Sequence, residues 1–340
     1  MRTGKPGVLP SEKASDMPAG LTSRSRFLVL GRAGMDLYAH PSGATAETAS
    51  HFATALGGSS GNIAAGLARQ GLAVSMLTCV SDDSVGRFVR RELEAYGVDT
   101  RHMKVLVDGS RTSLAITETR IEDTQNTLYR NNASDLLMDE AQVAGVDFEN
   151  FDALVVTGTA LAAHPSRQAT LRAMEHARAA GGYVVLDLDY RPYSWPGSLE
   201  AAETYRAAIE ASDLVVGNDD EFAVVADGTH EAGRVLAEQL GREDMTIVYK
   251  MGEKGSVVFS EAETFETGIF PVTAIKPMGA GDAFMALLLA SLAAGHSMRE
   301  AVRRGSAAAA MVVSTFGCAP AMPTPSDLET FLNAHSVPQS

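Results

Sequence analysis

The sequence has only two cysteines, Cys79 and Cys318, among 340 residues, and they lie far apart. It contains no CxxC pair and no Cys/His cluster, so it offers no motif typical of a cysteine-based metal site or redox centre. Two isolated cysteines favour buried thiols in a reducing compartment over a disulfide framework. We therefore predict a cytoplasmic protein.

Long apolar runs are also missing, and no segment approaches the ~18 residues that a membrane span needs. Residues 1–26 lack the apolar core of a secretory signal, and their proline, glycine, serine and charge content predicts a disordered extension. Cations are scarce, because 28 lysines and arginines oppose 42 aspartates and glutamates and give a net charge of −14. An acidic surface does not attract polyanions, so we expect neither nucleic acid nor a membrane as a partner.

The sequence does contain a regular alternation of short apolar, β-rich runs with helical patterns. This alternation predicts a doubly wound parallel sheet with helices on both faces, in which ligands bind at the carboxyl ends of the strands. Several runs end at glycine, aspartate or asparagine, as expected of strands that deliver residues to that edge. The predicted strands are 26–31, 74–80, 153–158, 183–188, 213–218 and 246–250, and the predicted helices include 61–71, 86–97, 166–181 and 282–295.

Two segments interrupt this alternation. Residues 37–57 and 111–131 alternate polar and apolar positions without a helical pattern, which is typical of a small antiparallel sheet with one solvated face. If the two segments pair, they form a lid over the carboxyl edge of the main sheet. Because no internal repeat or low-complexity linker is present, we expect one core and one lid.

The stretch 276–284, KPMGAGDAF, places two glycines and an aspartate at the start of an apolar helix. Amides at a helix N-terminus have no partner within the helix, so those of Gly279, Ala280 and Gly281 could hold developing negative charge. Asp282 would repel a bound pyrophosphate, but it could serve as a general base. From these residues alone, a glycine turn before a buried helix capped by Asp282 is an equally good explanation.

Three further short elements could contact ligands, and each also has a purely structural explanation. GGSSGN (57–62) places small residues before Asn62, which suits close approach of a ligand to the backbone or a flexible turn. MGEKGS (251–256) is typical of a hairpin turn, or alternatively of contact with phosphate or adenine. The three acids in NDDEF (218–222) could hold Mg²⁺ through water or could form a capped helix start.

Taken in order, these elements resemble the ribokinase-like (PfkB) family of carbohydrate kinases. The resemblance extends from about Arg26 to Pro325 and implies a three-layer α/β/α sandwich with a small antiparallel β lid, in a kinase domain of residues 27–336. The motifs that carry it are GRAGMDLYA, with a substrate-binding aspartate, the N-terminal signature GGSSGNIAAGLARQG, the N-x-x-E element NDDE, the nucleotide loop KMGEKGS, and the C-terminal signature GAGDAF.

The resemblance also implies roles for individual residues. Asp282 would be the catalytic base, the amides of Gly279, Ala280 and Gly281 would form an anion hole, and Glu221 would bind Mg²⁺ through water. The residues implied to contact ATP are Asn218, Lys250, Gly252 and Gly255. The residues implied to contact the sugar are Asp36, Gly57, Gly58, Asn62, Arg130 and Arg191.

Within the family, GRAGMDLYA, TGTALAAHPSR, LDLDYRPYSW and the lysine of KPMGAGDAF resemble the 5-dehydro-2-deoxygluconokinase subfamily of myo-inositol breakdown. That resemblance implies a phosphotransferase that uses ATP to phosphorylate the 6-hydroxyl of a sugar acid. Arg130 and Arg191 would suit its carboxylate, although a single arginine more often belongs to a structural ion pair. Three alternatives stay open: a 2-dehydro-3-deoxygluconokinase, another sugar or nucleoside kinase of the family, and a catalytically silent sugar-binding protein.

Lys276 departs from the family pattern D-T-x-G-A-G-D, in which the first acid helps to bind a monovalent cation. Here Lys276 replaces that acid, and Ala321 stands where many relatives carry a hydroxyl residue. We predict that the Lys276 ammonium does the electrostatic work of the cation, so that no monovalent cation is required. The alternative is a solvent-exposed Lys276 without such a role. We also expect a homodimer through the lid, because an exposed sheet often pairs with its twin.

Overall fold

The computed structural model of the protein describes residues 21–120, 123–226, 228–241, 245–276 and 278–335. Its main sheet consists of β1 (Arg26–Leu30), β4 (Ala73–Ser81), β5 (Met103–Leu106), β8 (Ala153–Thr157), β9 (Tyr183–Asp187), β10 (Leu214–Asn218), β11 (Thr246–Lys250), β12 (Ser256–Phe259) and β13 (Thr264–Thr267). The strand order is β13-β12-β11-β10-β9-β8-β1-β4-β5. All pairings from β11 to β5 are parallel, whereas β12 and β13 are antiparallel additions at one edge.

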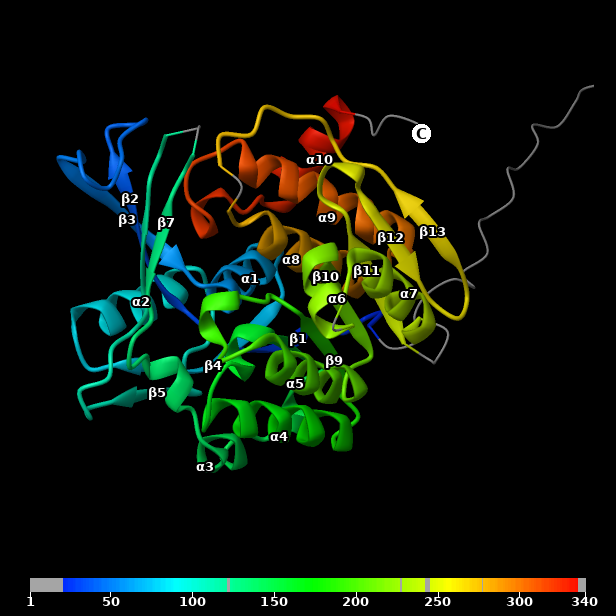
Figure 1. The fold of residues 1–340 in the computed structure, drawn as a ribbon, viewed down its shortest axis with the longest axis horizontal. Helices are drawn as coiled ribbons and strands as arrows, with labels where there is room; N and C mark the ends of the chain where they lie inside the picture. The colour runs from blue at the N-terminus through cyan, green and yellow to red at the C-terminus, as the bar shows by residue number, and fades with distance from the viewer. Residues whose placement is uncertain (1–20, 121–122, 227, 242–244, 277, 336–340) are drawn as a thin grey trace, which may run out of the picture.

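Helices cover both faces of this sheet, as the alternation predicts (Figure 1). One face carries α1 (Ser59–Arg69), α2 (Ser84–Ala95), α8 (Ala280–Ala293), α9 (Met298–Val313) and α10 (Pro325–Ala334). The other carries α3 (Glu140–Ala144), α4 (Ser166–Ala179), α5 (Ser198–Glu210), α6 (Asp219–Val225) and α7 (His230–Leu240). Short 3₁₀ turns connect these elements: η1 (Ser134–Leu137), η2 (Phe148–Asn150), η3 (Gly158–Leu161), η4 (Pro192–Ser194), η5 (Gly252–Lys254) and η6 (Ala319–Ala321).

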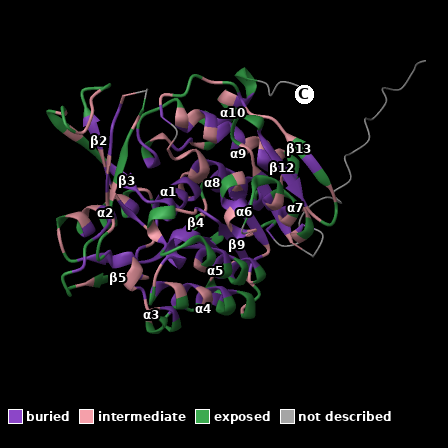
Figure 2. Ribbon diagram, viewed as in Figure 1, coloured by how far each residue is buried: buried purple, intermediate pink, exposed green. Residues whose placement is uncertain are grey.

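The strands are apolar at consecutive positions because both of their faces are buried. In β1, Phe27 and Val29 pack into the core beneath α8, while Leu28 and Leu30 pack into the core on the other side. Figure 2 shows the central strands as buried and the outer ends of the lid as exposed. Cys79 and Cys318 are free, buried thiols. Among the described helices, none combines the length and the apolar character that a membrane crossing demands.

All six predicted strands and the four predicted helices are confirmed, with bounds that agree within two residues. The helices end two residues before the glycines at which the sequence predicts their ends. Those glycines have φ between 77° and 88° and stand just beyond the helix, where the chain turns into the left-handed conformation that glycine adopts without strain. They are Gly71, Gly97, Gly181 and Gly295.

A second sheet projects from one side of the core and forms the lid (Figure 1). It consists of β2 (Gly34–His40), β3 (His51–Gly57), β6 (Leu114–Thr117) and β7 (Asn126–Tyr129), in the order β3-β2-β6-β7. The two outer pairings are antiparallel, but β2 and β6 are parallel. The sheet is therefore mixed and not wholly antiparallel, because β2 and β6 both start at the core and run outward.

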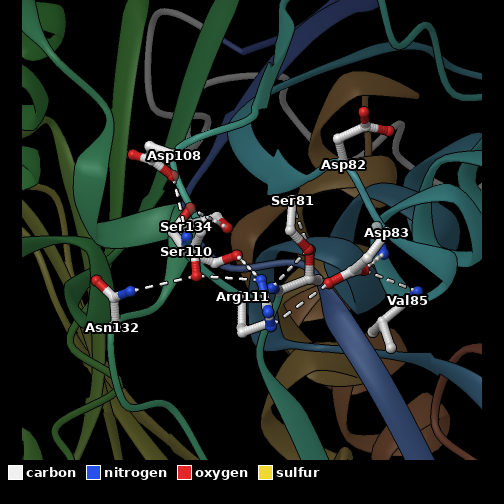
Figure 3. A network of polar contacts seen from close by, with 12 residues as sticks. Ser81, Asp82, Asp83, Val85, Asp108, Ser110, Arg111, Asn132 and Ser134 are labelled. Carbon is white, nitrogen blue, oxygen red and sulfur yellow. Dashed lines mark hydrogen bonds and ion pairs between the residues drawn. The ribbon is translucent and has the colours of Figure 1, made fainter.

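A polar network fixes the base of the lid to the core (Figure 3). Ser81 at the end of β4 and Thr112 before β6 exchange two hydrogen bonds, each 2.9 Å long, between amides and hydroxyls. The Arg111 amide donates to the Asn132 carbonyl at 3.0 Å, and the Ser134 amide donates to the Arg111 carbonyl at 2.9 Å. The segments leading into β6 and out of β7 are thereby joined to each other and to β4.

Residues 21–26 correct the predicted extension, because they are packed against the domain. Leu21 is 1% exposed and belongs to the core beneath α8. The Ser23 amide donates to the Ala293 carbonyl at 3.1 Å, and Arg26 pairs with Asp152 at 2.7 Å. The ordered domain therefore begins at least five residues before β1. The rest of the predicted extension, residues 1–20, lies outside the described part of the chain.

Candidate active site

The predicted site residues gather where the carboxyl ends of the strands meet the N-termini of α1 and α8. Asn62, in the first turn of α1, donates its side-chain amide to Asp282 Oδ2 at 2.7 Å. Asp282 lies in the first turn of α8 and is half-buried. This contact brings together the two glycine-containing signatures, which are far apart in the sequence.

The turn before α8 strongly favours glycine at position 279. Gly279 is the N-cap residue of α8, with φ of 84° in the left-handed region, and it makes no side-chain capping hydrogen bond. A Cβ there would lie 2.6 Å from Cys318 Sγ. Asp282 is three residues further on and is not the cap. The first amides of α8 have no partner within the helix and present their N–H groups at its start.

The environment of Asp282 makes it a weaker acid than an exposed aspartate. Burial raises its pKa to about 6, and the nearby Asp189 carboxylate adds to this shift. The hydrogen bond from Asn62 and the positive charges of Arg191 and Arg32 oppose it. Asp282 is therefore ionised at neutral pH, yet basic enough to accept a proton from a bound hydroxyl.

Asp36 projects from the lid strand β2 and is 9% exposed. Burial raises its pKa, while the charge of Arg32 and a hydrogen bond from the Tyr38 hydroxyl, 3.2 Å long, lower it. Gly57 at the end of β3 leaves room for this carboxylate, because a Cβ would lie 2.0 Å from Asp36 Oδ1. Gly58 has φ of 85°, and a Cβ there would lie 2.5 Å from the Arg32 carbonyl oxygen. Both glycines are required by close packing around Asp36 and Arg32.

Lys276 is buried, with 4% of its surface exposed, so the alternative of a solvent-facing lysine is wrong. Its ammonium donates to the Met278 carbonyl at 2.6 Å and lies 3.8 Å from Cys318 Sγ. The charge of Lys276 lowers the pKa of Asp36 and of Cys318, although burial leaves both above their ordinary values. A positive charge is thus fixed directly beneath the turn that precedes Gly279.

Asn218 and Glu221 form a capping box at the start of α6. The Glu221 amide donates to Asn218 Oδ1 at 2.9 Å, and the Asn218 amide donates to Glu221 Oε2 at 2.7 Å. Burial raises the pKa of Glu221, and the charge of Lys250 opposes this. The three consecutive acids do not converge on one point, because Asp220 turns outward to His230, 2.8 Å away. Of the three, only Glu221 is buried.

Two acids at the end of β9 join Glu221 and were not selected from the sequence. Asp187 and Asp189 are each 4% exposed. Burial raises the pKa of Asp187 to about 8; Lys250 opposes the shift, and Asp189, Glu221 and Asp282 add to it. Asp189 Oδ2 is buried and has no hydrogen-bond partner among the described residues. A group of carboxylates with an unpartnered oxygen suits Mg²⁺, which prefers carboxylate and water oxygens.

Lys250 extends from the end of β11 towards the start of α8. Its ammonium lies 5.9 Å from the centre of the Phe284 ring and 3.5 Å from the position a Cβ on Gly281 would take. The following loop is the predicted hairpin turn, since β11 and β12 are antiparallel. Gly255 is required by packing, because a Cβ there would lie 1.9 Å from a carbonyl oxygen, whereas the same position on Gly252 faces open space.

Both arginines that were predicted to contact the substrate are in ion pairs. Arg130 Nη2 lies 2.5 Å from Asp135 and also donates to the Thr159 carbonyl at 2.9 Å. Arg130 Nη1 is buried and has no partner among the described residues. Arg191 Nη2 lies 2.5 Å from Asp189, and the charge of this carboxylate raises the Arg191 pKa above its ordinary value. Each arginine therefore has a carboxylate partner in the structure, and its contact with the substrate stays a prediction.

Arg32 also lies in the site, although it had no predicted role. It stands in the turn between β1 and β2, and its carbonyl accepts a hydrogen bond of 3.2 Å from the Gly61 amide at the start of α1. Its charge lowers the pKa of both Asp36 and Asp282. The signal was its position directly after a strand and within the motif that contains Asp36.

The chain is similar to known carbohydrate kinases along nearly its whole length. The model of the pfkB family carbohydrate kinases matches residues 24–325. The 5-dehydro-2-deoxygluconokinase of Photobacterium profundum is 41% identical over 310 residues, which cover 90% of this chain and 94% of that protein. The protein of the same name from Bacillus subtilis is 36% identical over 313 residues, covering 91% and 96% of the two chains.

Solved structures share the fold. A fructokinase from Xylella fastidiosa with bound ATP superposes with a TM-score of 0.79 at 22% identity, covering 92% of this chain and 99% of that one. A fructokinase double mutant from Vibrio cholerae O395 with fructose, ADP and potassium bound has a TM-score of 0.78 at 24% identity, with 92% and 99% covered. Together with the match over residues 24–325, these similarities show that the chain belongs to the pfkB family of carbohydrate kinases, which are phosphotransferases.

Proposed function

We propose that the protein uses ATP to phosphorylate the 6-hydroxyl of the sugar acid 5-dehydro-2-deoxygluconate, in myo-inositol breakdown. Relatives named for this activity are 34–41% identical to the chain over about nine-tenths of its length. The observation that carries the proposal is the hydrogen bond of 2.7 Å between Asn62 and Asp282. It supports a single site in which a sugar held from α1 and the lid meets a carboxylate at the start of α8.

In the proposed mechanism, Asp282 takes the proton from the substrate hydroxyl, which attacks the γ-phosphorus of ATP. The pKa of about 6 supports this role, because the carboxylate is ionised at neutral pH. The amides of Gly279, Ala280 and Gly281 would stabilise the negative charge that spreads over the transferred group. Hydrogen bonds to the sugar would come from Asp36 and Asn62, and Gly57 and Gly58 would contribute to the sugar site by allowing the close packing that positions Asp36 and Arg32.

Asp187 at the end of β9, Asp189 two residues later and Glu221 at the start of α6 would hold Mg²⁺. The buried, unpartnered Oδ2 of Asp189 and the adjacent Asp187 and Glu221 support this assignment. When bound, Mg²⁺ would supply positive charge that neutralises the phosphate oxygens of ATP. The remaining residues proposed to contact the nucleotide are Asn218, Lys250, Gly252 and Gly255. The Lys250 ammonium lies 3.5 Å from the position a Cβ on Gly281 would take, which supports a contact with the transferred phosphoryl group.

Lys276 is proposed to replace a bound monovalent cation beside the anion hole. Its burial and its hydrogen bond to the Met278 carbonyl support a fixed positive charge there. We expect the turnover rate to be unchanged when potassium is replaced by tetramethylammonium, measured at constant ionic strength. Lys276→Met is expected to lose activity that potassium does not restore, because the methionine side chain supplies neither a charge nor ligands. Strong activation of the unaltered enzyme by potassium would contradict the proposal.

The lid is proposed to exclude water from the transferred phosphoryl group and to form a homodimer. Its face opposite Asp36 carries Leu37, Leu114 and Ile116, all partly exposed, and Tyr129, which is 55% exposed. We expect sedimentation equilibrium to give twice the chain mass of 35.8 kDa, and Tyr129→Asp to shift the protein towards monomer. A monomeric unaltered protein at micromolar concentration would contradict the dimer.

The function itself is tested by measuring ADP release with a panel of sugar acids and neutral sugars. We expect the highest kcat/KM with 5-dehydro-2-deoxygluconate and a product phosphorylated at the 6-hydroxyl. A preference for 2-dehydro-3-deoxygluconate would replace the proposed substrate by that of a related sugar-acid kinase. A preference for ribose, fructose or adenosine would refute a sugar-acid kinase, and binding without turnover of any sugar would indicate a silent binding protein.

A further inference from the structure

We propose that Arg32 binds the carboxylate of the sugar acid and gives the site its preference for an anionic substrate. This inference rests on the proposed function, since it assumes that the substrate carries a carboxylate. It differs from the sequence prediction, in which Arg130 and Arg191 provided the positive charge.

The backbone of Arg32 is held between the two elements that would bind the sugar. Its carbonyl accepts the Gly61 amide of α1 at 3.2 Å and lies against Gly58, where a Cβ would be only 2.5 Å away. Asp36 follows four residues later in β2, and Asn62 is one residue after Gly61. The backbone that carries the Arg32 side chain is therefore fixed between the lid strand β2 and helix α1, whose Asn62 contacts Asp282.

The guanidinium of Arg32 has a buried donor without a partner. Its Nε is buried and makes no hydrogen bond to any described residue. In the part of the chain that the structure describes, no carboxylate oxygen forms an ion pair with it within 4.0 Å. A buried N–H without a partner is unfavourable, and a carboxylate matches the paired donors of a guanidinium. A carboxylate on the ligand would accept a hydrogen bond from the buried Nε–H and would pair with the guanidinium.

The other positively charged side chains near the proposed sugar site are in ion pairs or donate a hydrogen bond to the backbone. Arg130 is paired with Asp135, and Arg191 with Asp189. Lys276 donates to the Met278 carbonyl below the anion hole. Arg32, in contrast, has no carboxylate within ion-pair distance among the described residues. Its charge nevertheless lowers the pKa of Asp36 and of Asp282.

The position of Arg32 also agrees with the shape of the substrate. The carboxylate and the 6-hydroxyl are at opposite ends of a six-carbon chain. A group that binds the carboxylate must therefore lie near Asp282 but beyond ion-pair distance from it. Arg32 meets this condition, because it influences Asp282 electrostatically without forming an ion pair with it within 4.0 Å.

The test compares the sugar acid with its primary amide, which keeps the shape but removes the charge. For Arg32→Gln we expect KM for the acid to rise about 10- to 100-fold, the loss of one or two charge-assisted hydrogen bonds, with KM for the amide nearly unchanged. Arg32→Lys keeps the charge but not the paired donors. We expect its KM for the acid to lie between that of the unaltered enzyme and that of Arg32→Gln. Arg91→Gln is the matched control, because Arg91 is exposed on α2, where it pairs with Glu92 and lies over the Phe88 ring, away from the site.

Each outcome has a defined meaning. If Arg32→Gln weakens the acid and the amide equally, or if the acid-to-amide ratio changes only in Arg130→Gln or Arg191→Gln, the inference is wrong while the proposed function stands. Calorimetric binding of the acid to each variant checks the result without turnover, and thermal melting checks folding. If the unaltered enzyme neither binds nor phosphorylates sugar acids, the proposed function fails, and the inference fails with it; that result is visible before any variant is made.

Discussion

Asp282→Asn is expected to lower kcat by ~10²–10⁴-fold, the usual contribution of a general base, while KM for ATP and for the sugar changes little. The asparagine oxygen can still accept the hydrogen bond that Asn62 gives to Asp282 at 2.7 Å, so the packing of α1 against α8 is preserved. An amide cannot accept the proton of the attacking hydroxyl. Steady-state kinetics with saturating ATP and sugar, together with calorimetric ATP binding, measure the two effects separately.

The pH dependence of kcat/KM distinguishes a base from a structural residue at this position. Below its pKa of about 6, Asp282 is protonated and cannot act as a base, so log kcat/KM should rise with a slope of one up to that pH and then level off. The hydrogen bond from Asn62 lowers this pKa, so in Asn62→Ala the rising part of the pH profile should shift to higher pH. The residual kcat/KM of Asp282→Asn should not show this rise with pH. Near-normal turnover of this variant would refute the assignment.

The core of the fold was predictable because each element carries its own local signal. Strands such as β8 and β10 are buried on both faces and are therefore continuous apolar runs, which the sequence displays directly. The lid was predictable for the complementary reason, since one face of its strands is solvated. The parallel pairing of β2 with β6 was not predictable, because it depends on where both strands leave the core.

The charges of the site were less predictable, because the partner of a charged side chain is set by tertiary contacts. Arg130 and Arg191 stood in motifs that suggested substrate binding, yet the structure pairs them with Asp135 and Asp189. Neither partner carries a sequence signal that separates it from a surface acid. Arg32 is the reverse case, since nothing in the sequence indicates that its Nε is buried without a partner.

Asp187 and Lys276 illustrate a third limit, which concerns burial. Asp187 is the last but one residue of the predicted strand 183–188, so its location at the carboxyl edge could be foreseen, but the pKa of about 8 depends on burial among Asp189, Glu221 and Asp282. Lys276 was open to both a buried and an exposed interpretation. Its 4% exposure follows from the packing of Cys318 and the Met278 turn around it, which sequence spacing does not reveal.

Gly279→Ala is expected to lower kcat by ~10²–10³-fold, the usual effect of losing an anion-hole donor. Alanine at a φ of 84° carries a backbone strain of about 1–2 kcal/mol. Its Cβ would also lie 2.6 Å from Cys318 Sγ, so the turn must shift. The amides of Ala280 and Gly281 follow directly and would move away from the transferred group. KM for ATP should change less than kcat, because these amides act on charge that develops during the transfer.

Gly295→Ala is the matched control for this prediction, since it imposes the same strain at the other end of α8. Gly295 has φ of 88°, and a Cβ there would meet its nearest neighbour at 3.8 Å, an ordinary contact. Both variants should therefore lose stability in thermal melts, but only Gly279→Ala should lose turnover. Adding Cys318→Ala to Gly279→Ala removes the sulfur and should restore part of kcat. If the two glycine variants lose turnover equally, the loss reflects destabilisation of α8, and the anion hole does not depend on the geometry of Gly279.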